Sequence, residues 1–288
     1  MTAALSIAVD ALAFGMVLFI ISVGLSVMMG LVRVVNLAHG AFAMIGGYVA
    51  SYMALQAGAG YALSLVTAVI ATVVVLMPLE FLLFRRIYRG ADPLRQILMT
   101  IGITFLIIGI TNFAFGPTSK PIPLPAMLSG PFDLGFRMVP THRIFVIIAG
   151  AVTAGALWFL LERTPFGVRI RASVDNAAMA EALGIRTEVL YAVTFALAVG
   201  LAAFGGVLGA ELLPIEPYYA LRYMVIFLVV VSVGGAGSIL GAVAASLVLG
   251  LASSAGRYLA PEFGDFFFYL TVIVVVFIFP HGLFGAKH

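Results

Sequence analysis

The stretch ALAFGMVLFIISVGLSVMMGL, residues 11–31, runs for 21 residues without a charged side chain. A transmembrane helix needs about 20 mostly apolar residues to cross roughly 30 Å of hydrocarbon, so this stretch is long enough to span a bilayer. Comparable runs occupy residues 37–55, 63–84, 97–115, 144–161, 189–213, 224–251 and 266–279. The sequence therefore predicts an all-α integral membrane protein, a polytopic helix bundle of about eight transmembrane segments that forms one domain over residues 1–288.

The composition of the 288-residue chain excludes a soluble domain. Hydrophobic residues make up 63% of the chain and charged residues 9%, and the mean hydropathy is +1.19. Soluble domains carry roughly a quarter charged residues. Lysine and arginine total 15 against 12 aspartate and glutamate residues, an excess too small to indicate nucleic-acid binding. Because the chain has no cysteine, it has no disulfide, no thiolate metal site and no cysteine nucleophile.

The apolar run 224–251 is interrupted near its middle by VGGAGS, residues 233–238. The pieces on either side are each short for a full crossing, and irregular backbone at membrane depth needs protein or a water-filled cavity around it. We expect two short helices around a glycine bend, a broken and re-entrant region buried in the bundle. The bend is explained either by close helix packing or by a kink that faces substrate. No lysine follows the glycines at the phosphate-loop spacing, which excludes a nucleotide-binding loop.

The arginines predict the orientation of the chain. Residues 85–95 hold four arginines, and residues 163–186 hold four more. Short loops rich in lysine and arginine face the cytoplasm, so both stretches are expected there. The proline-rich residues 116–141 and the acidic, aromatic residues 211–219 are expected on the outer side. Three spans before the first arginine stretch place the N-terminus outside, provided that the second span crosses completely.

A polar group lies between the first two spans. Asn36, His39 and Gly40 fall within five residues, and small residues follow at positions 43 and 47. These spacings place small residues on one helical face, where a neighbouring backbone can approach closely. Either this is a helix start at the membrane surface that Asn36 caps, or Asn36 and His39 line a polar path inside the bundle. Both hold if the second helix begins inside a cavity.

A second group predicts a short helix outside the membrane. Asp175 is a good N-cap, and Gly184 stands where a left-handed terminator is expected. The helix between them has about two turns and is too short to be stable alone in water. It therefore either packs on its own bundle as a connector or docks into a groove on a soluble partner.

Titratable residues give little support for catalysis. Glu80, at the inner end of the third span, precedes Arg85 and Arg86 closely, so an interfacial ion pair is its expected role. The other span interiors hold almost no ionisable group, whereas proton- and sodium-coupled carriers usually need one. We therefore expect a transport protein that is not an enzyme, holds no metal and takes its energy from elsewhere. The histidines are scattered: His39, His142, His281 and His288.

Several blocks together resemble a known family. Residues 36–40 read Asn-x-Ala-x-Gly, and residues 44–48 read Met-x-Gly-x-Tyr. This pattern resembles the signature of the LivH-type permease subunit of bacterial branched-chain amino acid ABC importers. The likeness continues in order along essentially the whole chain, in residues 100–102, 166–167, 182–185, 194–197, 203–208, 234–238 and 280–285.

The resemblance implies a permease domain over residues 1–288 that forms half of a translocation pathway in the bacterial inner membrane. It implies a LivM-type permease partner, two ATPase subunits of the LivG and LivF types, and a periplasmic substrate-binding protein. ATP and Mg²⁺ would be bound by the ATPase subunits, so the chain itself needs no cofactor. Related permeases serve branched-chain amino acids, urea and short amides, and aromatic or dicarboxylic acids, and the sequence does not choose among these substrates.

The resemblance also assigns site residues. A cytoplasmic coupling loop over about residues 163–186 would seat on an ATPase, and the outer segment would dock the binding protein. The translocation path would include Asn36, His39, Gly40, Gly234, Gly235, Gly237 and Ser238. The coupling helix would include Asp175, Asn176, Ala177, Glu181, Ala182, Leu183 and Gly184. The outer docking residues would be Glu211, Glu216 and Tyr218. An ion-coupled secondary transporter of small solutes is the alternative function.

Overall fold

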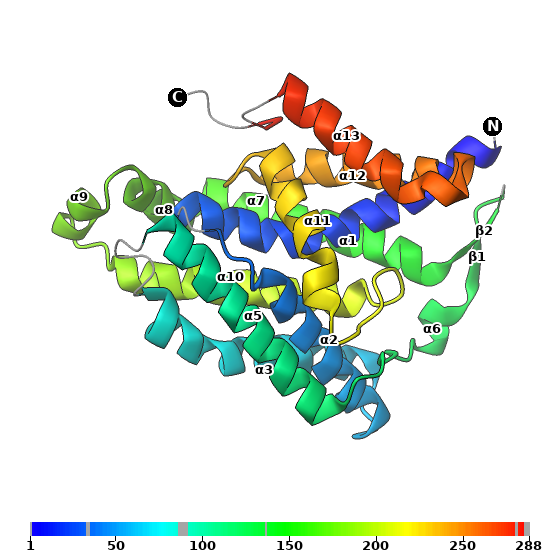
Figure 1. The fold of residues 1–288 in the computed structure, drawn as a ribbon, viewed down its shortest axis with the longest axis horizontal. Coiled ribbons are helices and arrows are strands. Elements are labelled where there is room, and N and C mark those ends of the chain that lie inside the picture. Colours follow the sequence, from blue (N-terminus) through cyan, green and yellow to red (C-terminus); the bar gives the residue numbers. More distant parts are fainter. Residues whose placement is uncertain (1, 33–34, 86–91, 136, 280–281, 285–288) are drawn as a thin grey trace.

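The computed structural model describes residues 2–32, 35–85, 92–135, 137–279 and 282–284. Within them, six helices are long and apolar enough to cross a membrane. Figure 1 shows most of these long helices running roughly along the long axis of the molecule. The six are α1 (Thr2–Val32), α3 (Tyr61–Leu79, continued by the π-helix η1, Glu80–Phe84), α5 (Pro93–Phe115), α7 (Thr141–Arg163), α10 (Thr187–Leu208) and α12 (Ile239–Leu259).

Shorter elements complete the described chain. The strands β1 and β2 form an antiparallel pair in which Phe132 is opposite Val139. The long apolar helices confirm the all-α polytopic bundle. The count of about eight spans stays approximate, because the two further apolar helices, α11 (Tyr219–Gly234) and α13 (Gly264–Ile278), are shorter. The shorter elements are α2 (His39–Leu55), α6 (Ala126–Ser129), β1 (Pro131–Asp133), β2 (Met138–Pro140), α8 (Pro165–Asp175), α9 (Ala177–Ala182), α11 (Tyr219–Gly234), η2 (Pro261–Phe263) and α13 (Gly264–Ile278).

The broken region predicted around the glycines is two helices, α11 and α12, joined by a tight turn. The expectation that both pieces are short is wrong for α12, which has 21 residues and reaches Leu259. Its last turns contain Ser253 and Gly256, which lower the hydropathy of the sequence there. Both residues are buried in the bundle, so the helix continues past the apolar run. Figure 1 shows the shorter α11 crossing α1 steeply instead of running beside it.

Helix α1 is the centre of the bundle and contacts α10, α12, α7 and α11. Its side chains Phe19, Ile20 and Ile21 are fully buried. Glycines allow close approach of the neighbouring backbones. A Cβ added at Gly24 would lie 2.8 Å from the backbone oxygen of Ala198 in α10. Close packing of small residues replaces the hydrophobic effect as the main source of helix association inside a bilayer.

Ion pairs show which loops share an end of the bundle. Asp10 near the start of α1 pairs with Arg137, at 3.3 Å, and with Arg143. Arg85 pairs with Glu188 at 3.1 Å, so the first arginine-rich stretch begins beside the start of α10, which directly follows the second. The N-terminus therefore lies with the loop 116–141, at the end opposite α8 and α9 (Figure 1). We call the end that carries α8 and α9 the inner end, and the other the outer end.

Candidate translocation and coupling sites

Helix α2 begins inside the bundle. Its first residue, His39, donates a hydrogen bond from Nε2 to the backbone oxygen of Ile21 over 2.8 Å. The carbonyl oxygen only accepts, so Nε2 carries the proton. At 1.5 Å per residue, Ile21 lies about 16 Å before the inner end of α1 at Val32. The start of α2 is therefore deep in the bundle, and we call this position, with the turn at residues 35–38 before it, the helix break.

The polar groups at this break are mostly satisfied by the protein. Asn36 is buried, and its Oδ1 accepts from the backbone nitrogen of Ala38 over 3.0 Å. Thr104 of α5 donates to the backbone oxygen of Leu37 over 3.3 Å. The N-cap position of α2 is Ala38, with no side-chain cap, so Asn36 closes a turn before the helix and the predicted capping role is wrong. Ala38 has φ −77° and ψ −4°, which is helical and not the extended backbone that a side-chain cap requires.

Three buried polar atoms near this break lack a hydrogen-bond partner among the described residues: His39 Nδ1, Ser22 Oγ and Tyr219 Oη. Tyr219 is the first residue of α11, and the next residue, Ala220, meets α2. A Cβ added at Gly40 would lie 3.3 Å from Cα of Ala220. The N-termini of two short helices therefore meet inside the bundle. Helix N-termini carry partial positive charge and favour anionic groups.

The glycine turn between α11 and α12 packs against the inner part of α1. The backbone nitrogen of Gly237 donates to the backbone oxygen of Ser26 over 3.0 Å and to its Oγ over 3.1 Å. Gly235 and Gly237 have φ of 93° and 83°, which favours glycine. Ser238 caps α12, because its Oγ accepts from the backbone nitrogen of Gly241 over 3.0 Å. Close packing therefore accounts for this sequence motif.

The predicted path residues thus form two groups on α1. Asn36, His39 and Gly40 lie at the level of Ile21, and the glycine turn lies at the level of Ser26, nearer the inner end. Gly234 and Gly235 are buried, whereas Gly237 is exposed. Each group contacts α1 and α11, and among the described residues no backbone hydrogen bond joins the two groups directly.

The predicted coupling helix is α9, and it ends as expected, with Gly184 at φ 87°. The prediction that Asp175 caps it is wrong. Asp175 is the last residue of α8, and Asn176 is the N-cap, with its Oδ1 accepting from the backbone nitrogen of Met179 over 2.9 Å. Asn176 has the extended backbone that a cap requires. The helix is also not isolated, since α8 directly precedes it.

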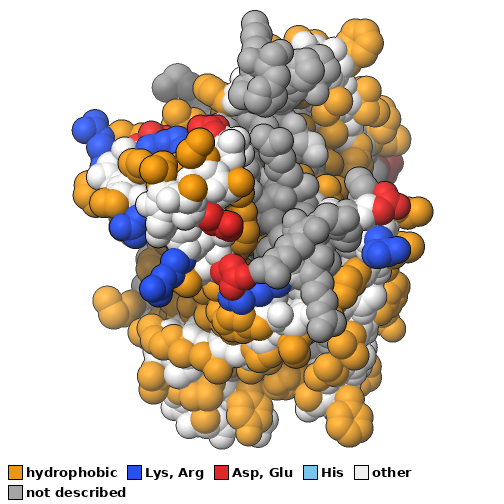
Figure 2. Space-filling view, turned by 90° about the vertical axis from the view of Figure 1, so that its left-hand side faces the viewer, with side chains coloured by type: hydrophobic (Ala, Val, Ile, Leu, Met, Phe, Trp, Pro, Cys, Tyr) orange, Lys and Arg blue, Asp and Glu red, His pale blue; other side chains and the backbone are white. Residues whose placement is uncertain are grey.

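Helix α9 presents apolar side chains to its surroundings. Met179 is 58% exposed, and Leu183, just after the helix, is 75% exposed. Ala182 and Glu181 are exposed as well, and Ala177 is half-buried. Figure 2 looks onto this inner end and shows charged side chains gathered around a protruding lobe, with hydrophobic side chains covering the flank below. A charged end with an exposed apolar helix is typical of a surface that binds a protein partner.

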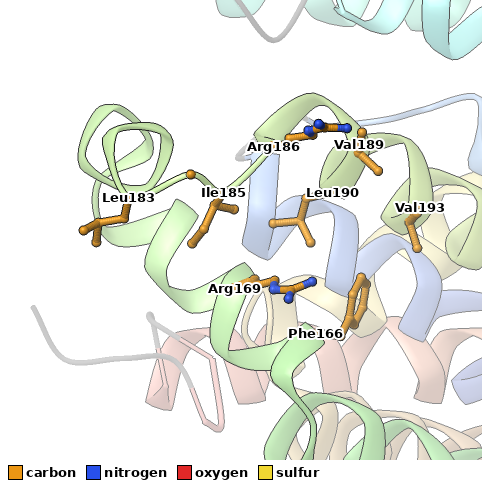
Figure 3. A pocket seen from close by; sticks show the side chains of 9 residues that line it. Phe166, Arg169, Leu183, Ile185, Arg186, Val189, Leu190 and Val193 are labelled. Carbon is orange, nitrogen blue, oxygen red and sulfur yellow. The ribbon is translucent and has the colours of Figure 1, made fainter.

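A hollow of about 480 Å³ lies beside α9, between α8 and the start of α10. Figure 3 shows Phe166 and Arg169 of α8 across the hollow from Leu190 of α10, with Arg186 at its rim. Leu183 and Ile185 close the end of the hollow next to α9. The hollow therefore combines apolar walls with two guanidinium groups.

The predicted outer residues lie in the connection between α10 and α11. Glu211 and Tyr218 are exposed. Glu216 is half-buried, and its Oε1 accepts from Arg222 Nη1 over 2.8 Å. The backbone oxygen of Ile215 accepts from the backbone nitrogen of Lys120 over 3.0 Å, so this connection is tied to the loop after α5. All three predicted residues are therefore at the outer end.

The predicted ion pair of Glu80 is confirmed for Arg85, at 3.3 Å, while Arg86, His281 and His288 lie outside the described residues. Sequence reasoning missed Glu188, which pairs with the same guanidinium from α10. The two acids are far apart in the sequence, and only the fold brings them to one arginine. Pro78, inside an apolar helix, is the sequence signal that could have marked this region.

The fold and the buried helix break define a multi-pass membrane protein of the kind that moves small solutes. Within the described residues no group of three His, Asp or Glu side chains is placed to hold a metal ion. Residues 7–276 match the family described as branched-chain amino acid transport system / permease component, and the chain belongs to this family. It is therefore a transport subunit.

The chain is also similar to several proteins that are named as branched-chain amino acid transport permeases. The high-affinity branched-chain amino acid transport system permease protein LivH of Escherichia coli K12 is 26% identical, over 92% of this chain and 90% of its own length. BraD of Pseudomonas aeruginosa, also named as a high-affinity branched-chain amino acid transport system permease protein, is 26% identical over 96% of this chain and 94% of its own length. LivH of Methanocaldococcus jannaschii, named as a probable branched-chain amino acid transport permease protein, is 25% identical over 96% of this chain and 91% of its own length. No solved structure matches the chain.

Proposed function

We propose that the chain is the LivH-type permease subunit of an ABC importer for branched-chain amino acids, one domain over residues 1–288 in the bacterial inner membrane. It would form half of the pathway with a LivM-type subunit. Two ATPase subunits of the LivG and LivF types would bind ATP and Mg²⁺, and a periplasmic binding protein would deliver the substrate. Family membership and the names of the relatives support this proposal.

The observation that carries the proposal is the exposed pair of helices α8 and α9 at the inner end. Helix α9 has six residues, too few to be stable alone in water. It is held by the Asn176 cap and by a hydrogen bond from Thr187 Oγ1 to Glu181. With Met179 and Leu183 facing outward, it is suited to a groove on a soluble ATPase. The adjacent hollow with Arg169 and Arg186 would receive acidic groups of the same partner.

The solute path is proposed to pass the meeting point of α2 and α11. The two helix N-termini suit the carboxylate of an amino acid, and buried apolar walls suit its side chain. His39 Nδ1 and Tyr219 Oη supply polar atoms that have no partner among the described residues. The chain performs no catalysis in this account, so the energy comes from ATP hydrolysed by the partner. Glu211, Glu216 and Tyr218 are proposed to contact the binding protein.

Co-purification tests this function. The chain is expressed with LivM-, LivG- and LivF-type subunits, and the ATPases are expected to purify with the two permeases. Met179→Asp in α9 is expected to abolish ATPase retention, because it places a charge at the apolar contact. Met127→Asp, on an exposed methionine at the outer end, is the matched control and should retain both ATPases. Equal retention by both variants would contradict docking at α9.

A further inference from the structure

The inner end of α3 is a π-helix and not an α-helix. Pro78 lies inside α3 and cannot donate a backbone hydrogen bond to the preceding turn. Two residues later η1 begins, and the backbone nitrogen of Arg85 donates to the oxygen of Glu80, five positions earlier. Single π-turns of this kind are rare and recur at functional sites. The turn contacts α10 as well as α3.

One guanidinium group joins this π-turn to the first turn of α10. The Glu80 side chain is 0% exposed, and its Oε2 lies 3.3 Å from Arg85 Nε. Arg85 Nη1 lies 3.1 Å from Oε2 of Glu188, whose side chain is 51% exposed. The guanidinium also lies over the ring of Phe81, with 4.5 Å between Cζ and the ring centroid. A buried carboxylate needs its cation, so Arg85 is held in place between the two helices.

The same first turn of α10 is attached to α9. Thr187, which precedes Glu188, donates from Oγ1 to the Glu181 carboxylate of α9. The backbone nitrogen of Ile185 donates to the oxygen of Ala180 over 3.0 Å. A movement of α9 therefore reaches Glu188 through two hydrogen bonds and a short connection.

An aromatic row leads from the π-turn to the start of α2. The ring centroids of Phe84 and Phe195 are 5.2 Å apart, and those of Phe195 and Phe42 are 5.8 Å apart. Phe42 meets His39 edge to face, also at 5.8 Å. All four side chains are almost completely buried. Close-packed interiors transmit displacement instead of absorbing it.

We propose that η1 is the junction that transmits movement of the ATPase-docking helix to the helix break at His39, with Arg85 and Glu188 as positioning residues. The proposal rests on the proposed function, because it takes α9 as the ATPase contact. Two side-chain contacts, Thr187 with Glu181 and Arg85 with Glu188, connect α9 to the π-turn through the start of α10. The packed rings of Phe84, Phe195 and Phe42 transmit the displacement from the π-turn to α2. The π-turn is the element that changes register when α10 moves.

The test measures leucine transported per ATP hydrolysed, in proteoliposomes that contain both permeases, both ATPases and the binding protein. Glu188→Gln is expected to lower this ratio at least threefold while the ATPases stay bound. Arg85→Gln is expected to do the same, and the double variant should lose no more than the larger single loss, because both changes remove the same interaction between Arg85 and Glu188. Arg137→Gln, which breaks an ion pair at the outer end, should leave the ratio unchanged.

An unchanged ratio in Glu188→Gln would overturn the junction, and so would a double variant whose loss is the product of the single losses. If Arg85→Gln does not fold because Glu80 is left buried and unpaired, Glu188→Gln decides alone. Its side chain is half exposed, and the contact between Glu80 and Arg85 remains. A wild-type complex that does not assemble would instead contradict the proposed function, so the two failures are distinguishable.

Discussion

The imidazole of His39 donates from Nε2 to the backbone oxygen of Ile21 over 2.8 Å and so fixes the first residue of α2 to the middle of α1. The bond places the helix break between α1 and α2 well inside the bundle. Gly40, the next residue, meets Ala220 at the start of α11. The histidine therefore fixes α2 to the central helix, and the glycine after it brings the N-termini of α2 and α11 together.

Replacing this histidine is expected to impair transport more than folding. His39→Leu removes the bond to Ile21, which costs about 1 kcal/mol, and lets the start of α2 shift. Leucine uptake by the complete complex should fall at least tenfold with the ATPases still bound. His142→Leu is the matched control, since His142 is also buried and its Nε2 has no partner among the described residues. Equal uptake by the two variants would show that His39 is only a packing residue.

Close contact between α2 and α10 predicts a difference between two glycines. A Cβ added at Gly46 would lie 2.6 Å from Cα of Ala203, whereas one added at Gly109 of α5 meets nothing within 4 Å. Gly46→Ala should therefore destabilise the purified protein by about 1–3 kcal/mol. Gly109→Ala should be neutral or stabilising by up to about 1 kcal/mol. Thermal unfolding in detergent measures both, and similar unfolding temperatures would contradict the close packing.

The sequence was sufficient for the features that depend on local pattern. The apolar run at residues 11–31 predicted the central helix, because length and hydropathy alone decide a span. The glycines at 234–237 predicted the turn, because positive φ favours glycine. Gly184 predicted the end of the coupling helix for the same reason.

Features that depend on packing were not predictable. The depth at which α2 begins depends on the bond between His39 and Ile21, residues of two different helices. Asp175 and Asn176 are both good caps, and the choice between them depends on where α8 ends. The partner Glu188 follows Arg85 by about a hundred positions, so no local pattern relates them.

The two candidate caps of α9 predict different effects on ATPase binding. Asn176→Ala removes the bond to Met179 and should cost about 1 kcal/mol, or roughly a fivefold weaker affinity for the ATPase subunits. Asp175→Ala should have little effect, because an acidic side chain at the end of α8 does not stabilise that helix. Titration of the purified permease pair with ATPase measures both affinities. A larger loss for Asp175→Ala would reverse the assignment of the cap.

The backbone of the turn between α11 and α12 predicts that any side chain at Gly237 lowers the stability of the protein. Its φ of 83° is unfavourable for alanine by about 1–2 kcal/mol, so Gly237→Ala should lower the unfolding temperature. The control is Gly130→Ala, at an outer glycine with φ −78° and open space around it. If both variants unfold at the wild-type temperature, this turn does not have the described backbone.

The measurement that tests the central claim most directly is leucine uptake into proteoliposomes under two energy sources. The complete complex is expected to accumulate leucine when ATP is supplied on the side of the membrane that carries the ATPase subunits and the binding protein is supplied on the other side. Uptake should stop without ATP or without the ATPase subunits. The chain alone, given an imposed proton or sodium gradient, should accumulate none. Gradient-driven uptake by the chain alone would contradict the account and establish an ion-coupled secondary transporter.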